Sequence, residues 1–207
     1  TGSGHYLHDV ALAKRSVTAA EPVSLVFFTE STSYKYPPFA PILKRLNYAG
    51  VYEATITPTD WIGNEFFQGR PTGGILNGCV VWNYDGWLED SLGSPSGCFP
   101  AYYDCNAATL AGAASVLPGW STSWPTAWTA RSVRPFGNFL VAMFKRVWTD
   151  ESTVTPYPHT VFWSDAAAGG IPSTWTASST NMAGETELEP HGGSLIDGYP
   201  LGNDFIL

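Results

Sequence analysis

The side chains best suited to chemistry lie in one stretch, CVVWNYDGWLEDSLGSPSGCFPAYYDC, residues 79–105, which contains no lysine, arginine or histidine. Its candidate tryptophans and acids are Trp82, Trp87, Asp85, Glu89 and Asp90. Indole rings stack on sugar faces, and two carboxyl groups at the right separation carry out glycoside hydrolysis. Nothing in the pattern decides which carboxyl is protonated, and acids beside turns are ordinarily solvated. One hypothesis is therefore a secreted domain that binds or hydrolyses carbohydrate through residues 82–90.

A second group of side chains with metal-binding chemistry lies near the start of the sequence. His5 and His8 are three residues apart and Asp9 follows, so on a helix the three share a face. Imidazole and carboxylate groups bind divalent metals or act as an acid and base pair. A catalytic zinc needs a third protein ligand, and the pattern lacks the glutamate of H-E-x-x-H. We expect no metal and no cofactor, and interpret residues 5–9 as the solvated start of a helix.

All three cysteines, Cys79, Cys98 and Cys105, fall in the same aromatic stretch. Secreted domains usually pair their cysteines, and an odd number does not pair completely. Cys98 and Cys105 are spaced to close a short loop as a disulfide. Three reduced, partly buried thiols are the alternative that we favour.

The charge balance argues against several classes of partner. Charged residues make up only 14% of the chain, and ten Lys and Arg stand against 18 Asp and Glu. Nucleic acids are bound mainly through basic side chains that neutralise phosphates, so direct nucleic-acid binding is not expected. No apolar run reaches the roughly 18–20 residues that a membrane-spanning helix needs.

Aromatic residues are abundant, at 14% of the chain with nine tryptophans. Many aromatic residues combined with few charges are typical of the buried centre of a protein interface. The sequence also finishes on bare apolar residues, 205–207, which we expect to dock against this fold or a neighbour. We therefore predict self-association, with these tryptophans as buried interface anchors: Trp82, Trp87, Trp120, Trp124 and Trp128.

The elements that must position these residues are predicted from periodicity and turn signals. Apolar residues in 136–148 recur with the i, i+3, i+4 spacing of a helix, with a buried strand over 139–144 as the alternative. Further helices are expected at 6–14, 41–48 and 105–117, and strands at 22–29, 51–57, 75–84 and 159–165. The prediction is an α+β fold with a mixed sheet of about four strands, three or four short helices and long Pro/Gly-rich loops.

Length and the first residues bear on how the chain is organised. The 207 residues suffice for a single domain, 1–207, which buries roughly 70% of the surface exposed by the unfolded chain. The sequence begins with TGSG rather than Met. We expect a processed chain or a part of a longer one.

In its composition and its predicted mixture of short helices and loops, the whole chain resembles the coat proteins of icosahedral viruses. The stretch VRPFGNFLVAMFKRVWTDESTVTPYPHTVFW is similar to parts of totivirus-like double-stranded RNA virus coat proteins. The resemblance implies a virion location and partners that are copies of the chain or other shell proteins. Together with the aromatic surplus, it leads us to expect a structural, self-assembling capsid protein rather than an enzyme. The alternative is the extracellular carbohydrate-binding or carbohydrate-hydrolysing domain described above.

Overall fold

The computed structural model describes residues 4–14, 22–31, 39–46, 52–56, 72–83, 99–104, 115–123, 125–150, 153–189 and 193–207, with side chains from residue 72 onward. Every regular element in these ranges is a β-strand, and all strand pairs are antiparallel. The predicted α+β class is therefore wrong, because the described chain is a mostly-β protein with about 53% strand. The described segments contain no helix long and apolar enough to cross a membrane.

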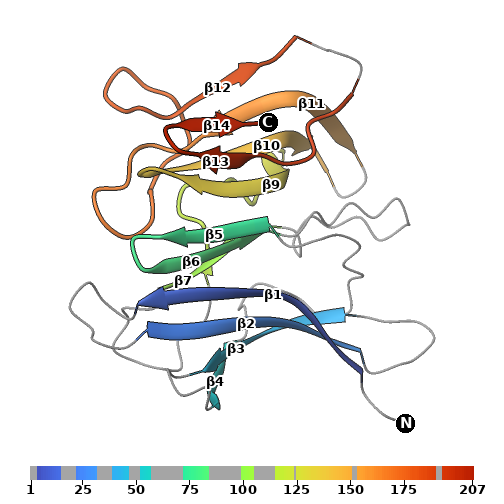
Figure 1. Ribbon diagram of the computed structural model, residues 1–207. Coiled ribbons are helices and arrows are strands. Elements are labelled where there is room, and N and C mark those ends of the chain that lie inside the picture. The colour runs from blue at the N-terminus through green and yellow to red at the C-terminus, as the bar shows by residue number, and fades with distance from the viewer. Residues whose placement is uncertain are drawn as a thin grey trace.

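The first sheet is a four-stranded meander that forms the lowest layer of the molecule in Figure 1. Its strands are β1 (Gly4–Lys14), β2 (Pro22–Ser31), β3 (Phe39–Leu46) and β4 (Tyr52–Ile56). The helices predicted at 6–14 and 41–48 are wrong, because β1 and β3 flank β2 and pair with it over most of its length. Local helix propensity is a weak preference that this long-range pairing overrides.

The second sheet forms the middle layer and contains the most completely buried strand that the structure describes. It consists of β5 (Thr72–Leu76), β6 (Cys79–Asn83), β7 (Ala101–Asp104) and β8 (Ser115–Val116). All five residues of β6 are buried. Asn77 and Gly78 form the two-residue turn between β5 and β6, both with the positive φ angles that such hairpins require.

The third sheet carries most of the core and runs in the order β12-β11-β10-β9. Its strands are β9 (Ala127–Phe136), β10 (Phe139–Trp148), β11 (Val154–Trp163) and β12 (Gly184–Glu187). The helix predicted at 136–148 is wrong, and the alternative strand over 139–144 is right. Leu140 and Ala142 face one side of β10 while Val141 and Met143 face the other, and all four are buried. A strand buried on both faces reads as a continuous apolar run, which also satisfies helical spacing.

The pairing of β10 with β11 is interrupted at Phe144, where residues 158–160 of β11 lie opposite this single residue. Phe144 has a φ of 56°, which is costly for a residue with a side chain. The guanidinium groups of Arg131 and Arg146 lie 5.5 and 4.6 Å from the centre of its ring. Cation–π attraction from these two arginines offsets part of the backbone strain.

Side chains, rather than a backbone ladder, join the second and third sheets where β5 lies beside β9 (Figure 1). The Val133 N–H donates to Thr72 Oγ1 at 3.0 Å, and Asn83 Nδ2 donates to the Ala130 carbonyl at 3.1 Å. The edge of β9 is thereby hydrogen-bonded without another strand, which protects it from pairing with foreign chains. We call this junction the β5–β9 seam.

The main core lies under the third sheet and contains a cluster of four aromatic rings. Trp120 stacks on Trp128 with ring centres 4.0 Å apart, and Phe162 and Trp175 pack around the pair at tilted or edge-on angles. Trp120 Nε1 donates to the Trp128 carbonyl at 2.7 Å. Such pairs contribute roughly 0.5–1.5 kcal/mol beyond the burial of their area.

Candidate functional site

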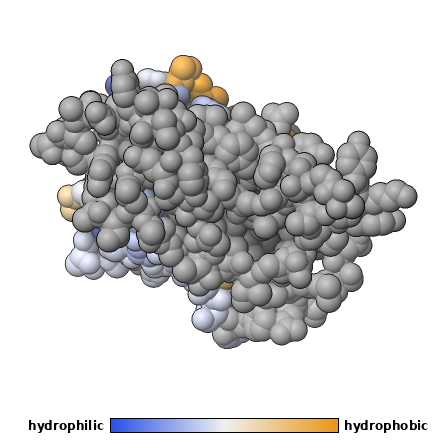
Figure 2. Space-filling model, turned by 90° about the horizontal axis from the view of Figure 1, so that it is seen from below, coloured by the Kyte–Doolittle hydropathy of each residue, from blue (hydrophilic) through white to orange (hydrophobic). Residues whose placement is uncertain are grey.

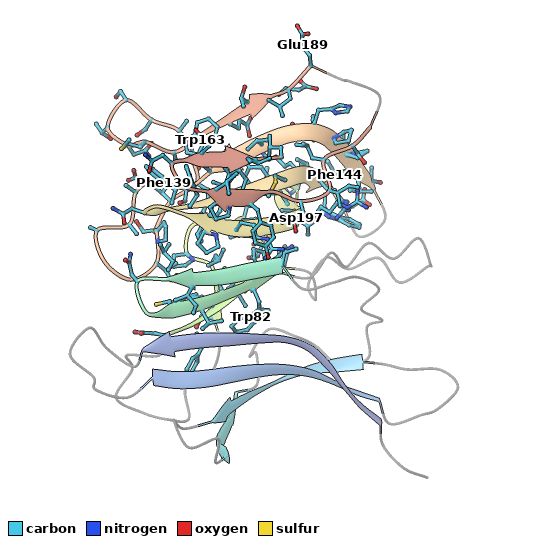
Figure 3. The ribbon with its side chains drawn as sticks, viewed as in Figure 1. Trp82, Phe139, Phe144, Trp163, Glu189 and Asp197 are labelled. Carbon is cyan, nitrogen blue, oxygen red and sulfur yellow. The ribbon has the colours of Figure 1, made fainter. Side chains whose placement is uncertain are left out.

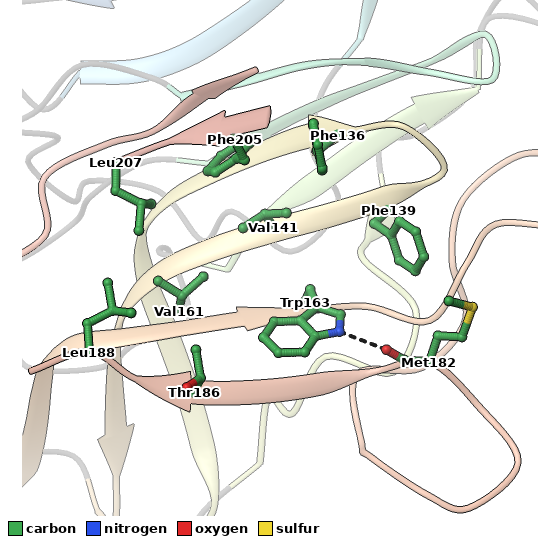
Figure 4. A pocket seen from close by; sticks show the side chains of 10 residues that line it. All are labelled: Phe136, Phe139, Val141, Val161, Trp163, Met182, Thr186, Leu188, Phe205 and Leu207. Carbon is green, nitrogen blue, oxygen red and sulfur yellow. Dashed lines mark hydrogen bonds between the residues drawn. The ribbon is translucent and has the colours of Figure 1, made fainter. Parts of the chain in front are cut away.

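An apolar groove of about 380 Å³ opens on the side of the third sheet that faces away from the aromatic cluster. A short hairpin of β13 (Tyr199–Leu201) and β14 (Asp204–Ile206) forms one of its walls. Figure 4 shows the residues that line it. They are Phe136, Phe139, Val141, Val161, Trp163, Met182, Thr186, Leu188, Phe205 and Leu207. None of these side chains titrates near neutral pH, so the groove is suited to binding apolar groups rather than to acid–base chemistry.

Strand register builds the floor of the groove. Val141 on β10 lies directly opposite Trp163 on β11, and the side chains of both reach the same face. Gly184 on β12 pairs with Trp163, and a Cβ at Gly184 would lie 2.6 Å from the indole Cζ2. The absence of a side chain at Gly184 therefore makes room for the ring. Trp163 Nε1 donates to the Met182 carbonyl at 2.7 Å, which fixes the ring's orientation (Figure 4).

The β13–β14 hairpin presents two different faces. Phe205 points to the sheet and packs edge-on against Phe136, with ring centres 5.4 Å apart. Tyr199 and Ile206 are directly cross-strand, and Leu201 lies two residues from Tyr199 on the same side. Because side chains alternate along a strand, these three occupy the face turned away from the sheet. All three are at least half exposed.

An ion pair fixes the chain just before the hairpin to β9. Asp197 accepts from Arg134 Nε at 3.0 Å and from Nη2 at 2.6 Å, and it also accepts from Ser132 Oγ. Arg134 Nη1 donates to the Gly73 carbonyl of β5, and its guanidinium lies 4.5 Å from the centre of the Tyr199 ring. The same arginine therefore contacts β5, β9 and the hairpin. Figure 3 shows Asp197 at this junction.

Burial and hydrogen bonding act in opposite directions on the pKa of Asp197. Partial burial alone would raise the pKa, because it disfavours the charged carboxylate. Hydrogen bonds from Arg134 and Ser132, a further one from the Gly198 N–H, and the arginine's charge hold the pKa below its ordinary value. The carboxylate is therefore ionised at neutral pH and fully engaged in this contact.

Exposed apolar side chains concentrate around the groove and the hairpin. Among the residues whose burial is described, eight large hydrophobic residues are exposed, and only Ile75 and Tyr157 lie elsewhere. The other six have relative exposures between 49% and 68%, and we call them the hairpin surface: Met182, Ile196, Tyr199, Leu201, Ile206 and Leu207. In the view of Figure 2, the hydrophobic residues that can be seen lie in small areas at the edge of the molecule.

The predicted interface tryptophans that the structure describes are packed inside this chain. Trp82 is 2% exposed and Trp120 is 6% exposed, both among this chain's own residues, and Trp128 is half-buried in the aromatic cluster. Figure 3 places Trp82 within the molecule, between the first two layers. Trp87 and Trp124 lie outside the described residues. The role of the five tryptophans as interface anchors stays a prediction. Within the single chain, Trp82 and Trp120 pack in the interior.

The predicted catalytic residues cannot be placed in the fold, and the metal-ligand candidates lie on a strand. Asp85, Glu89 and Asp90 lie outside the described residues, and Trp82 is too deeply buried to offer a face to a sugar ring. His5, His8 and Asp9 belong to strand β1, so the helical face on which the metal hypothesis depended does not exist. Within the described segments, no group of three His, Cys, Asp or Glu side chains is placed to hold a metal.

Of the three cysteines, the structure describes Cys79, a buried thiol in β6. This agrees with the preferred interpretation of a reduced, buried residue at that position. Cys98 and Cys105 lie outside the described residues.

No protein-family model matches the sequence, and no curated protein matches it. The functional argument therefore depends on the groove and the hairpin surface. Sequence reasoning missed the individual residues of both, although the apolar ending at 205–207 indicated a docking segment.

Proposed function

We propose that the chain is a structural protein that self-assembles, and that the assembly is a viral capsid located in the virion. The observation that carries this proposal is the hairpin surface. Single exposed apolar residues are normal on soluble proteins, but contiguous apolar patches usually mark sites of association. Here six of the eight exposed large hydrophobic residues with described burial belong to one segment, residues 182–207, which also borders the groove.

The charge composition supports association with other protein chains. The groove lining carries no charged residue, and the chain as a whole has only 14% charged residues. Depletion of charge is the compositional mark of an interface centre. The resemblance in composition to icosahedral virus coat proteins gives the proposed assembly its form, a closed shell of many copies.

The test is the state of association of the purified full chain. Sedimentation velocity over a wide range of concentration should show mass increasing with concentration, and electron microscopy should show closed particles. Discrete oligomers without closed particles would support self-assembly and contradict the capsid assignment. A stable monomer at every concentration would overturn the whole proposal.

A further inference from the structure

We propose that the hairpin surface is a two-fold contact, in which the β13–β14 ridge of one copy enters the apolar groove of a second copy. The inference depends on the proposed self-assembly and specifies the surface and the partner. The occupant of the groove is then the outer face of another copy's hairpin, with Tyr199, Leu201 and Ile206 as the inserted side chains.

The shapes of the ridge and groove support a reciprocal contact. The exposed side chains of the hairpin border the groove, and Leu207 belongs to the groove wall as well as to the hairpin surface. A surface that carries both a projection and a hollow matches its own copy after a two-fold rotation. Each chain then donates one ridge and accepts one, so the contact closes on a pair.

The available area matches what such a pair needs. The six residues of the hairpin surface expose between 49% and 68% of their surface. Taking about 180 Å² as the full accessible area of a residue of this size, they present roughly 600 Å² per copy. If all of this surface were covered, two copies together would bury about 1,200 Å², which is the lower end of the range for specific protein interfaces.

The ridge is ordered before it meets a partner, which lowers the entropic cost of association. Arg134 lies against the Tyr199 ring, Asp197 fixes the start of the segment, and Phe205 is packed against Phe136. Pro200 removes one N–H donor from β13, so the hairpin is poorly suited to adding a strand to another sheet. Its outer face is therefore suited to contact through side chains.

Charge favours this face over the neighbouring edge of the sheet. Glu185, Glu187 and Glu189 are all exposed along or just after β12. Glu185 is paired with Lys145, but two copies that met through β12 would bring Glu187 and Glu189 close to the same acids of the other copy, and like charges in contact are destabilising. The outer face of the hairpin carries one acid, Asp204, directly across from Leu201 at the end of the hairpin, so fewer like charges meet there. Because each copy carries a net charge of −8, added salt should tighten the contact by screening the remaining repulsion.

The first experiment substitutes exposed residues, so that folding is preserved. Leu201→Glu and Ile206→Glu place an acid on the ridge, and Met182→Glu places one at the edge of the groove. Ile75→Glu, at an exposed apolar position on β5, is the matched control. Circular dichroism checks folding, and sedimentation equilibrium measures dissociation. Each of the first three variants should weaken dimer formation roughly a hundredfold, since a buried unpaired charge costs several kcal/mol. The control should associate like the unsubstituted chain.

The second experiment identifies the contact directly in the full chain. Benzoylphenylalanine in place of Leu201 should, on irradiation, give a covalent species of twice the chain mass. Peptide mapping should place the link in residues 182–188 of the other copy. Links confined to other regions, or dimer formation unaffected by Leu201→Glu, would overturn this contact while leaving self-assembly in place. A monomeric unsubstituted chain would overturn both.

Discussion

The ion pair between Asp197 and Arg134 gives the most direct test of how the hairpin is held. We consider Asp197→Asn, Arg134→Gln and the double variant. Asparagine keeps the size of aspartate but loses its charge, so the single change removes the charge-assisted bonds with little change in packing. We expect the hairpin to detach more often, while the sheet beneath it remains folded.

The expected magnitude follows from partial burial. The side chains of Arg134 and Asp197 are 12% and 30% exposed. Surface ion pairs contribute about 0–1 kcal/mol, and removing one partner of a buried pair costs about 3–5 kcal/mol. The bidentate geometry and partial burial place the coupling at about 2 kcal/mol. Loss of this coupling should raise the equilibrium constant for detachment of the hairpin about thirtyfold.

Hydrogen exchange measured by mass spectrometry provides the assay. Peptides covering 195–207 should exchange about thirtyfold faster in either single variant, whereas peptides from β10 should be unchanged. The double variant should be little worse than either single one, because the same interaction is removed in all three. Additive effects, or hairpin exchange within about twofold of the unsubstituted chain, would refute the assignment of this pair as the attachment of the hairpin.

The pH dependence of attachment follows from the same pair. The folded pKa of Asp197 lies below its ordinary value because the bonds from Arg134 and Ser132 outweigh the effect of burial. The stabilisation is therefore fully present above the unfolded pKa of about 4 and is lost as pH falls through the lower folded value. Hairpin exchange should accelerate below about pH 4 after correction for its intrinsic pH dependence. Asp197→Asn should remove this acid sensitivity, and an unchanged acid response in that variant would contradict the assignment.

Two further predictions concern the groove and the aromatic cluster. Gly184→Ala should cost about 1–3 kcal/mol of unfolding free energy, because its Cβ would overlap the Trp163 ring, whereas Gly193→Ala, with open space around it, should be nearly neutral. Equal urea midpoints for these two variants would contradict the close approach. Trp120→Phe should cost about 1 kcal/mol more than Trp175→Phe, because Trp120 Nε1 donates a hydrogen bond and the buried Trp175 Nε1 makes none. Equal losses in urea unfolding would show that the bond contributes little.

The strands with clear alternation or β-branched residues were predictable from the sequence. The predictions at 22–29, 51–57 and 159–165 fall on β2, β4 and the end of β11. These segments are short and their residue types suit a pleated surface. Local information was enough at these positions.

The helix predicted at 136–148 shows where periodicity misleads. The apolar run of β10 is long because both of its faces are buried, and such a run satisfies helical and strand spacing equally. The residues of the preceding turn distinguish the strand from the helix. Gly137 and Asn138 form a two-residue turn with Phe136 paired to Phe139, and Gly137 has a φ of 57°. A Gly-Asn pair between apolar runs indicates a hairpin, and Asn77-Gly78 carries the same kind of signal.

The groove was beyond prediction from local pattern. Its residues come from β9, β10, β11, β12, β14 and the segments around 182, 188 and 207, and only strand register brings them to one face. The attachment of the hairpin joins Asp197 to residues more than sixty positions earlier. A local spacing pattern cannot predict a contact between residues so far apart in the sequence. Large aromatic rings also fill cores, as Trp82 and Trp120 do here, so the number of aromatic residues alone did not indicate which rings would be buried.

The β5–β9 seam joins two sheets through individual side chains. Ladders of peptide hydrogen bonds are the same for every sequence, but this connection depends on Thr72, Asn83 and Arg134. A substitution at any of them removes a hydrogen bond between the two sheets while leaving the backbone ladders inside each sheet in place. The relative placement of the two layers is therefore encoded in a few individual side chains.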